Sequence, residues 1–545
     1  MVNLTINDQS VSVSKTSSLL DAIRSQGISI PSLCYLKDLN EIGACRVCVV
    51  EVQGTDYLVP SCNTPIKEGM VVYTHSEKAM QARKTNMELI LSQHDFQCGK
   101  CVRMGNCNLP KVMGEVKAKK DSFPPNIPPM DWNLQFPLIR DESKCIKCMR
   151  CIQVCNKIQS LGVWDLIGSG QHTTIGTSRH CDIEETNCSL CGQCITHCPT
   201  SALRERDDNQ DLLKALEDPE QISAVQISPA VLTSWGEAFR LSPEEATQER
   251  LSAVLHSIGF DYVFPTAFGV DLTINQESRK FLDFFSKKKE NDLPMFSSCC
   301  PAWLRFVQSE YPELQTQLSD TKSPQQILGE ALKTQFASEQ NLDPKKLHFT
   351  AITSCLAAKD ECKSTTADTL ADVDIALTAR EFIRFLKSKR LDFKNIPQKP
   401  YDSPFATHSG AGVLFGYAGG YTEALLRNIY FSLTKENPPL DLFYSLREDQ
   451  GWKEAEFIIK DKKIKVAVVD GLANARKLIE ALLAKKVSYD FVEVMACPGG
   501  CVGGGGQPFI DGEELAGKRK PLLYALDEEN SLHFAHENPT SVPIN

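Results

Sequence analysis

Apolar and polar residues alternate in two different ways along this chain. Near the start they alternate strictly over residues 2–6 and 11–14, and an apolar run follows at 47–54, which predicts three strands. Residues 18–27 carry apolar side chains at helical spacing and predict a helix between these strands. The first part of the chain is therefore expected to form a small α+β domain.

From about residue 221 onward, short apolar runs alternate with amphipathic segments, after a polar, helix-like connector at 203–220. Buried strands that alternate with helices indicate α/β units around parallel sheets. In such folds ligands bind beyond the carboxyl ends of the strands. The expected strands lie within 222–228, 261–269, 347–354, 373–378, 464–471 and 489–496, and the expected helices are 244–259, 379–388 and 474–486.

Length and charge narrow the class of protein. At 545 residues the chain exceeds the roughly 100–200 residues of one domain, so several domains are expected. Its net charge of −10 argues against a nucleic-acid partner and suits a redox protein. The sequence shows no apolar run of about 18 residues, and its start lacks the basic flank and apolar core of a signal peptide. We therefore expect a cytoplasmic protein without membrane association.

The chain holds 22 cysteines, and most of them cluster. Disulfide scaffolds are shorter and denser in cysteine, whereas clustered cysteines in a cytosolic chain indicate metal binding. The first group has the spacing C-x10-C-x2-C-x13-C, with a close pair between two distant thiolates. With the strands and helix around it, this group resembles a 2Fe-2S ferredoxin of the β-grasp type, and a zinc ribbon is the alternative. Its members are Cys34, Cys45, Cys48 and Cys62.

The second group combines one imidazole with three thiols, in His94, Cys98, Cys101 and Cys107. Such a set suits tetrahedral zinc, and it equally suits a 4Fe-4S cluster with one histidine ligand. Spacing alone leaves both open. The neighbouring motifs favour the 4Fe-4S cluster, because a chain of electron carriers has no use for zinc.

The third and fourth groups each have the spacing C-x2-C-x2-C-x3-C, and the fourth ends in proline. Two such runs are typical of a bacterial two-cluster ferredoxin, in which the fourth cysteine of each run binds the other cluster. Cys155 is therefore expected with the second triad and Cys198 with the first, while Cys181 is read as structural. The two runs are Cys145, Cys148, Cys151 and Cys155, and then Cys188, Cys191, Cys194 and Cys198.

Three further cysteine motifs follow expected strands in the second half of the chain. Four of their thiols would be enough for one more 4Fe-4S cluster, namely Cys300, Cys355, Cys497 and Cys501. Cys299 is then left beside the cluster, a disulfide between Cys299 and Cys300 being the strained alternative. Cys362 is read as incidental. The glycines at 503–506 suggest that bare backbone faces a cofactor larger than the cube.

These three motifs resemble the signatures of FeFe-hydrogenases, T-S-C-C-P-x-W, M-P-C-x-x-K-x-x-E and E-x-M-A-C-x-x-G-C-x-x-G-G-G-Q-P. The third is complete at residues 493–508. The order of the upstream cluster motifs also resembles the long clostridial-type enzymes, so the likeness covers nearly the whole chain. It implies an H-cluster, a 4Fe-4S cube joined by one cysteine to a di-iron unit with CO, cyanide and an azadithiolate bridge.

The resemblance also implies roles for individual residues. Cys501 would bridge the cube and the di-iron unit, and Cys299 would pass protons to the bridge amine, since an ordinary thiol pKa near 8.5 allows both proton states. Ser319 and Glu277 match two members of the family's proton path. The residues that match the lining of the di-iron pocket are Pro229, Ala230, Ser323, Gln325, Phe415 and Met495.

The sequence departs from the family pattern at four positions. Thr353 and Ser354 stand where methionine and proline are usual, and Ala358 stands where the family has a lysine that contacts a cyanide. Lys359 is the adjacent amine, and we include it among the expected cofactor-binding residues. Lys280 occupies the place of a second glutamate of the proton path and reverses the charge there. Cluster binding is therefore expected, and fast turnover is the open question.

The expected fold is multidomain, α/β plus α+β, with a two-lobed α/β catalytic domain. The predicted divisions are a 2Fe-2S ferredoxin-like domain at 1–80, a His/Cys3 4Fe-4S domain at 81–125, a two-cluster ferredoxin domain at 135–207 and an H-cluster catalytic domain at 208–545. The predicted cofactors are the H-cluster, three accessory 4Fe-4S clusters and one 2Fe-2S cluster.

The predicted function is reversible reduction of protons to H2 with electrons from the accessory clusters. A hydrogenase-like H2 sensor with low turnover is the alternative, although no signalling domain is recognised in the few residues after Pro508. An iron–sulfur scaffold that lacks the di-iron unit is a third reading. No dinucleotide fingerprint follows a strand, so ferredoxin or a flavin-containing subunit is the expected electron partner, and maturation proteins would supply the di-iron unit.

Overall fold

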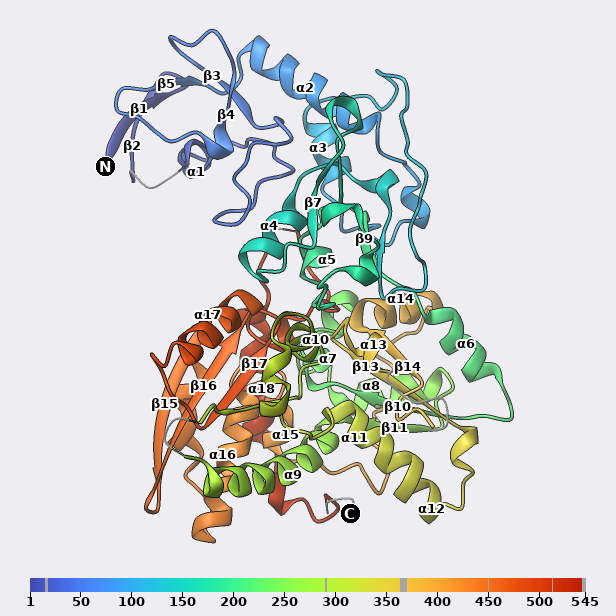
Figure 1. The fold of residues 1–545 in the computed structure, drawn as a ribbon. Helices are drawn as coiled ribbons and strands as arrows, with labels where there is room; N and C mark the ends of the chain where they lie inside the picture. The colour runs from blue at the N-terminus through green and yellow to red at the C-terminus, as the bar shows by residue number, and fades with distance from the viewer. Residues whose placement is uncertain (15–17, 290–291, 363–369, 449, 512, 542–545) are drawn as a thin grey trace.

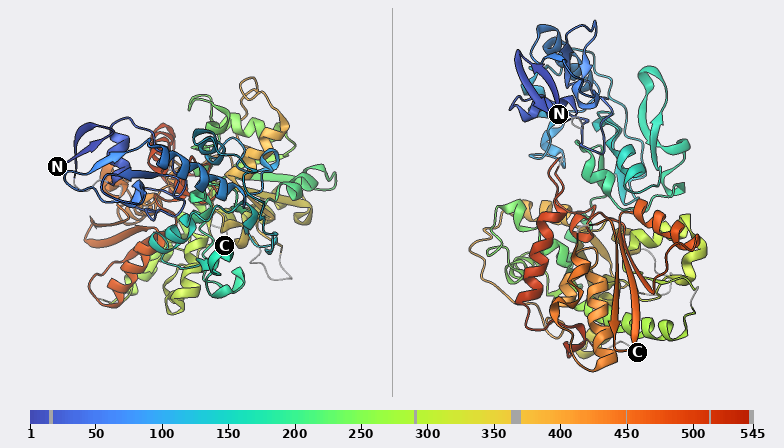
Figure 2. Two further views of the ribbon diagram at one scale, coloured as in Figure 1. Left: turned by 90° about the horizontal axis from the view of Figure 1, so that it is seen from above. Right: turned by 90° about the vertical axis from the view of Figure 1, so that its left-hand side faces the viewer.

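The computed structural model describes residues 1–14, 18–289, 292–362, 370–448, 450–511 and 513–541. The segments up to β9 (Leu203–Glu205) stand together above a larger body formed by most of the rest of the chain (Figure 1). The same separation is visible from the side in Figure 2. The fold is mixed α/β with parallel sheets, as the sequence predicts. None of the helices in these ranges is long and apolar enough to cross a bilayer.

The N-terminal segment forms a five-stranded sheet with the order β2-β1-β5-β3-β4. Its helix begins where expected because the hydroxyl of Ser18 accepts from the backbone N–H of Asp21 and caps the first turn. The helix packs Leu20 and Ile23 against the sheet. The elements are β1 (Val2–Ile6), β2 (Gln9–Val13), α1 (Leu19–Ser25), β3 (Val49–Val52), β4 (Val59–Pro60) and β5 (Val71–Tyr73).

The next segment consists of short helices and two antiparallel ribbons, β6–β9 and β7–β8. The connector expected to be helical from residue 203 begins instead with a strand, because Leu203 pairs with Arg140 and closes the β6–β9 ribbon. The helix α6 starts only at Asn209. The elements are α2 (Glu77–Leu91), α3 (Leu109–Glu115), β6 (Leu138–Arg140), α4 (Arg150–Lys157), β7 (Trp164–Ile167), β8 (Thr174–Thr177), α5 (Gln193–His197), β9 (Leu203–Glu205) and α6 (Asn209–Glu217).

The first large sheet has the order β11-β10-β13-β14, and all its strands are parallel. Alternate strand residues point to opposite faces, so Val225 and Ile352 pack under α8 and α14, while Phe349 packs against α9 and α11. The apolar run at 261–269 is divided between β11 and α9 at Pro265, which cannot donate to a ladder. The elements are β10 (Ile222–Ile227), α8 (Gln248–Ser257), β11 (Tyr262–Pro265), α9 (Thr266–Lys287), α11 (Pro324–Ala331), β13 (Leu347–Thr353), β14 (Ile375–Thr378) and α14 (Ala379–Lys389).

The second large sheet has the order β12-β17-β16-β15, in which β15 alone is antiparallel to its neighbour. Val492 and Val494 face α10 and α17, whereas Phe491 and Met495 face α9 and α16. The elements are β12 (Met295–Phe296), α10 (Pro301–Glu310), α16 (Gly420–Thr434), β15 (Trp452–Ile459), β16 (Lys462–Asp470), α17 (Leu472–Leu483) and β17 (Phe491–Met495).

The long helix α9 joins the cores of the two large sheets. Its Phe268 and Leu272 pack with the first sheet, and its Ile274 and Phe281 pack with the second. The carboxyl ends of β12, β13 and β17 therefore come together near this helix, and each is followed by one of the cysteine motifs. The remaining helices are α7 (Pro229–Leu232), α12 (Ala337–Glu339), α13 (Ala358–Glu361), α15 (Gly410–Leu414) and α18 (Ala516–Glu529).

Candidate functional site

One cavity gathers the thiols of all three strand-end motifs, from Cys299, Cys300, Cys355, Cys497 and Cys501. Cys300 caps the start of α10, Cys355 follows β13, and the other pair follows β17. Three loops distant in sequence thus place their sulfur atoms around a common space.

The chemistry of these thiols fits an iron–sulfur cluster. Burial raises the pKa of Cys497 to about 12, and the thiolate charges of its neighbours act in the same direction on Cys355 and Cys501. A buried set of mutually repelling thiolates is stable only with cationic charge at its centre, because the charged form is otherwise poorly solvated. The donor set therefore suits a 4Fe-4S cube.

We expected the glycine run to face a bulky cofactor, and the structure gives most of it another neighbour. Of the glycines at 503–506, only Gly504 lines the cavity, together with Gly500 just before Cys501. A Cβ atom on Gly505 would lie 2.1 Å from the carbonyl oxygen of Cys191, and one on Gly504 would lie 2.4 Å from that of Ser354. These contacts require residues without side chains. The run therefore serves close packing of backbone on backbone, and the expectation was wrong for Gly505.

Four of the six residues expected to line the pocket do so: Ser323, Gln325, Phe415 and Met495. Pro229 and Ala230 lie outside the cavity lining, at the start of α7. The carbonyl oxygen of Ala230 accepts from Gln507 Nε2 at 2.6 Å, which ties α7 to the glycine-rich loop. The structure thus gives Ala230 a supporting position behind the cavity wall.

The wall beside Cys355 carries an acid and no lysine. Ala358 lines the cavity together with Glu361, whose carboxylate accepts from Gln325 Nε2. Burial raises the pKa of Glu361 to about 7. The methyl group at position 358 leaves this side of the cavity without the ammonium that the family pattern places there.

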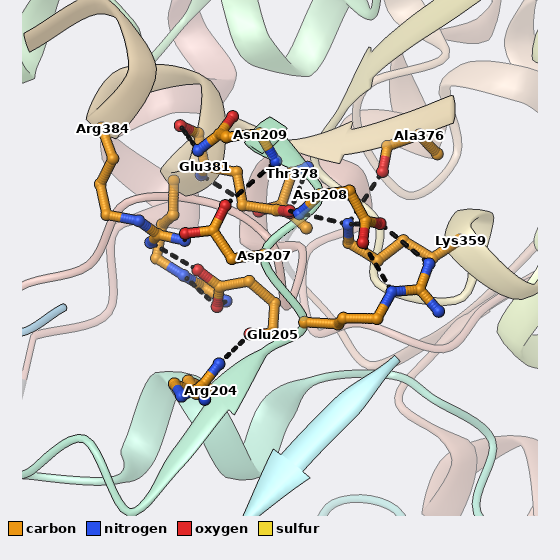
Figure 3. Close-up of polar contacts among 12 residues, drawn as sticks. Arg204, Glu205, Asp207, Asp208, Asn209, Lys359, Ala376, Thr378, Glu381 and Arg384 are labelled. Atoms are coloured by element: carbon orange, nitrogen blue, oxygen red, sulfur yellow. Dashed lines mark hydrogen bonds and ion pairs between the residues drawn. The ribbon is translucent and has the colours of Figure 1, made fainter. Parts of the chain in front are cut away.

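Lys359 points away from the cavity and into a buried polar cluster (Figure 3). Its Nζ lies 2.7 Å from Asp208 Oδ2 and 2.8 Å from Glu381 Oε1, and it donates to the carbonyl of Ala376 at 3.0 Å. The side chain is fully buried. Lys359 therefore joins α13 to the connector at Asp208 and to α14, and it does not replace the missing cation of the cavity.

Cys299 lies at the cavity and within electrostatic reach of Glu277, which is buried on α9. The hydroxyl of Ser319 donates to Glu277 Oε2 at 2.5 Å. Burial raises the pKa of Glu277 to about 7 and raises the pKa of Cys299 well above its ordinary value. The ordinary thiol pKa assumed from the sequence therefore does not apply to Cys299, because its thiolate would be unsolvated.

Two buried residues near this pair were not assigned a role from the sequence. Burial raises the pKa of Tyr421 on α16, and the nearby charges of Glu277 and Cys299 act in the same direction. Glu493 on β17 accepts from the backbone N–H groups of Gly419 and Thr422, each at 2.8 Å. Its position within the third motif was the only available hint of a role.

The first cysteine group is buried, and its thiols contact one another. This group also lies against the third one. Asn40 Nδ2 donates to the carbonyls of Cys34 at 2.7 Å and Cys148 at 3.0 Å. The guanidinium of Arg150 donates to three carbonyls of the Leu33–Tyr35 loop.

In the second group, His94 is buried and its Nδ1 lies 3.2 Å from the carbonyl oxygen of Lys144. A carbonyl can only accept, so Nδ1 carries the proton and Nε2 keeps its lone pair for a metal. Burial lowers the pKa of His94 to about 4, which keeps the ring neutral. Cys101 donates to Ser201 Oγ at 3.0 Å, next to the fourth group.

The two regular runs exchange their last cysteines in space. Cys198 lines one cavity with Cys145, Cys148 and Cys151. Cys155 lies within electrostatic range of Cys188 and Cys194. The Cys181 thiol, outside both sets, donates to the carbonyl of Ser178 at 3.2 Å.

The comparisons with known proteins match these segments in order. Family models match as "2Fe-2S iron-sulfur cluster binding domain" over 1–77, "NADH-ubiquinone oxidoreductase-G iron-sulfur binding region" over 83–121, "4Fe-4S dicluster domain" over 144–202 and "Iron only hydrogenase large subunit, C-terminal domain" over 221–505. The last covers more than half of the chain.

Full-length relatives are found as well. The chain is 37% identical to the NADP-reducing hydrogenase subunit HndD of Solidesulfovibrio fructosivorans, over 100% of this chain and 95% of the relative. It is 34% identical to iron hydrogenase 1 of Clostridium pasteurianum, over 100% and 96%. A variant of the [FeFe]-hydrogenase HydA1 from Chlamydomonas reinhardtii superimposes with a TM-score of 0.54 at 34% identity, covering 61% of this chain and 92% of that one. The chain thus belongs to the iron-only hydrogenases, the FeFe-hydrogenase family that its three cysteine motifs resemble.

Proposed function

We propose that this hydrogenase interconverts protons and H2 at an H-cluster whose cube is held by Cys300, Cys355, Cys497 and Cys501, with Cys501 also bound to the di-iron unit. The observation that carries the proposal is the convergence of these four thiols, from three strand ends, on one cavity. When bound, the di-iron unit supplies the metal site at which H2 is formed or split. The protein supplies the thiol ligands and a largely apolar wall that includes Phe415 and Met495.

Protons would reach the cavity through Ser319, Glu277 and Cys299. The Ser319 hydroxyl donates to Glu277 Oε2, and this carboxyl has a pKa raised to about 7, so it can both hold and release a proton near neutral pH. Cys299 lines the cavity and is near enough to this carboxyl for the Glu277 charge to act on it. Because burial disfavours its thiolate, Cys299 would receive one proton as it gives up another.

Electrons would reach the cavity through one 2Fe-2S cluster and three accessory 4Fe-4S clusters. Asn40 connects the first group to the loop of Cys148, and Cys101 connects the second group to Ser201. Both branches therefore meet at the cluster site of Cys145, Cys148, Cys151 and Cys198. From there the site of Cys188, Cys191, Cys194 and Cys155 leads to the cavity, where Cys497 Sγ lies 3.7 Å from the Cys191 carbonyl oxygen.

The electron partner would be ferredoxin or a flavin-containing subunit. The name of the relative HndD describes a subunit of an NADP-reducing hydrogenase, which favours a flavin-containing subunit between the pyridine nucleotide and this chain. Maturation proteins would insert the di-iron unit. A cytoplasmic location is part of this proposal.

Infrared spectroscopy of the matured protein under H2 and under argon tests the proposal. Bands from bound CO and cyanide that change between the two gases are expected. Their absence from protein exposed to the maturation proteins would favour a scaffold and reject the proposed cofactor.

The matched variant Cys299→Ser tests the proton role at constant cofactor content. We expect it to keep its iron and its infrared bands and to lose nearly all turnover. Unchanged turnover would reject the role of Cys299. The comparisons support hydrogenase function rather than the sensor alternative, and a rate assay with a strong electron donor would show turnover at ordinary hydrogenase levels.

A further inference from the structure

The solvent end of the proposed proton path carries a lysine that the structure pairs with an acid from another element. Glu277 and Lys280 lie three positions apart on α9, so both face the loop that follows Leu318. Lys280 Nζ lies 2.5 Å from Asp320 Oδ1, and Asp320 is the residue directly after Ser319. The hydrogen-bonded pair of Ser319 and Glu277 therefore lies next to the ion pair of Asp320 and Lys280.

Burial changes steeply across these four residues. Glu277 is fully buried and Ser319 is 8% exposed. The Lys280 side chain is 32% exposed and that of Asp320 is 84% exposed. Ser319, Lys280 and Asp320 all line an open groove of about 660 Å³. Ser319 is therefore the residue at which the buried carboxyl meets the groove, with the ion pair at the rim.

An unpaired ammonium at this rim would oppose proton entry in two ways. It would repel protons that approach Ser319 from the groove, and it would stabilise the charged form of Glu277 and so lower its pKa. The carboxylate of Asp320 acts on Glu277 with the opposite sign. Within the part of the chain that the structure describes, the other ionisable groups whose charges interact with Glu277 are Tyr421 and Cys299, on the inner side of the path.

We propose that Asp320 is a positioning residue that neutralises Lys280 at the mouth of the Ser319–Glu277 path, so that this chain keeps a proton entrance although it carries a lysine there. The proposal rests on the proton path given under the proposed function. It assigns Asp320 a role by charge and position, without contact to the reacting atoms. It also explains why a basic residue is tolerated three positions from Glu277.

The test measures Glu277 in protein that contains its accessory clusters and lacks the di-iron unit, so the result does not depend on H2 turnover. The carbonyl band of the protonated Glu277 carboxyl is identified by its loss in Glu277→Gln. Titration of this band with pH gives the acid dissociation constant of Glu277. The time course of the band's shift after transfer to D2O gives the rate of proton exchange with solvent. Asp320→Asn is compared with Asp283→Asn, which removes another acid that lines the same groove and pairs with Lys287.

We expect Asp320→Asn to raise the acid dissociation constant of Glu277 about two- to fivefold at low salt, the size typical of a partly exposed charge, and to slow proton exchange. High salt should shrink both effects by screening. Asp283→Asn should leave both values unchanged, and Lys280→Met combined with Asp320→Asn should restore them. The proposal is overturned if Asp320→Asn matches Asp283→Asn, or if the double variant stays as impaired as Asp320→Asn. Failure of the infrared test for CO and cyanide would instead reject the H-cluster and leave this measurement intact.

Discussion

The thiol of Cys497, a proposed ligand of the H-cluster cube, lies 3.7 Å from the carbonyl oxygen of Cys191, which belongs to the two-cluster motif. These residues are 306 positions apart in the chain. Gln193 Nε2 donates to the carbonyl of Gly503 at 3.0 Å and fastens the same contact. The last accessory cluster site and the catalytic cavity therefore share one interface.

Gly505→Ala should loosen this interface. Its Cβ would meet the Cys191 carbonyl at 2.1 Å, so backbone must shift, and overpacking of this kind destabilises by about 1–3 kcal/mol. Because electron tunnelling weakens steeply with separation, H2 evolution through the accessory clusters should also slow. Thermal unfolding and H2 evolution would measure the two effects.

Gly517→Ala is the matched control, since Gly517 lies exposed in α18 with nothing within 4 Å of a Cβ. It should be neutral or stabilising by up to about 1 kcal/mol, because alanine favours a helix over glycine. Equal behaviour of the two variants would contradict the packing role of Gly505.

Lys359→Met should destabilise the catalytic part of the chain strongly. It leaves the fully buried carboxylate of Glu381 without the ammonium it pairs with, whereas Asp208 keeps its ion pair with Arg206. Breaking a buried pair in this way costs about 3–5 kcal/mol. The urea midpoint of unfolding, followed by tryptophan fluorescence, would show the loss. In Lys346→Met the same change removes only a surface pair with Glu220 and should cost about 0–1 kcal/mol. A Lys359 variant as stable as the Lys346 variant would refute the structural role.

Glu277→Gln should change how stability depends on pH. The folded-state pKa of about 7 lies above the ordinary value of 4.5, so the folded state binds more protons than the unfolded state in that interval. The free energy of unfolding of the wild type therefore falls as pH rises from 4.5 to 7, by about 3 kcal/mol from this group. The amide of the Glu277→Gln variant does not titrate, so the variant does not show this fall in the free energy of unfolding. Urea unfolding at pH 5 and pH 8 should show the variant gaining stability relative to the wild type at the higher pH, and a constant difference would disprove the raised pKa.

Arg103→Gln should lower the reduction potentials of two accessory clusters. Arg103 is only 5% exposed, lies in electrostatic range of Cys107 and Cys198, and its Nε and Nη1 have no hydrogen-bond partner among the described residues. A cation between two clusters favours their reduced, more negative states. A hydrogen bond to a charged group is worth about 1.5–3 kcal/mol, and about 1.4 kcal/mol corresponds to 59 mV for one electron, so shifts of tens of millivolts are expected.

A redox titration followed by electron paramagnetic resonance would measure these potentials. Arg103→Lys keeps the positive charge, so both reduction potentials should stay close to those of the wild type. Unaltered potentials in Arg103→Gln would show that the guanidinium does not act on the clusters.

Local patterns predicted the parallel sheets and the hydrogenase family, because strand period and cysteine spacing are properties of short segments. These patterns gave wrong predictions where contacts with residues distant in sequence determine the local structure. Leu203 forms a strand instead of a helix because Arg140 pairs with it from an earlier segment. The start of α8 at Gln248, later than expected, follows from the Thr247 hydroxyl, which accepts from the backbone N–H of Arg250.

The same distinction applies to the site. Sequence adjacency placed Lys359 beside the cofactor, but Asp208 and Glu381 attract its ammonium to the opposite side of α13. The bare backbone of Gly505 was attributed to a cofactor because its true neighbour, Cys191, cannot be inferred from the motif. The pairing of Lys280 with Asp320 was hidden for a similar reason, since the two belong to separate elements.

The backbone contact at Gly505 limits how freely this architecture can be recombined. Gly192 faces it with a φ of +73°, and a Cβ there would lie 2.9 Å from the Cα of Gly505. A chimaera that joins a foreign ferredoxin module to this catalytic half must therefore keep glycine on both sides of the seam. A module that lacks either glycine would hold the two cluster sites farther apart and would pass electrons between them more slowly.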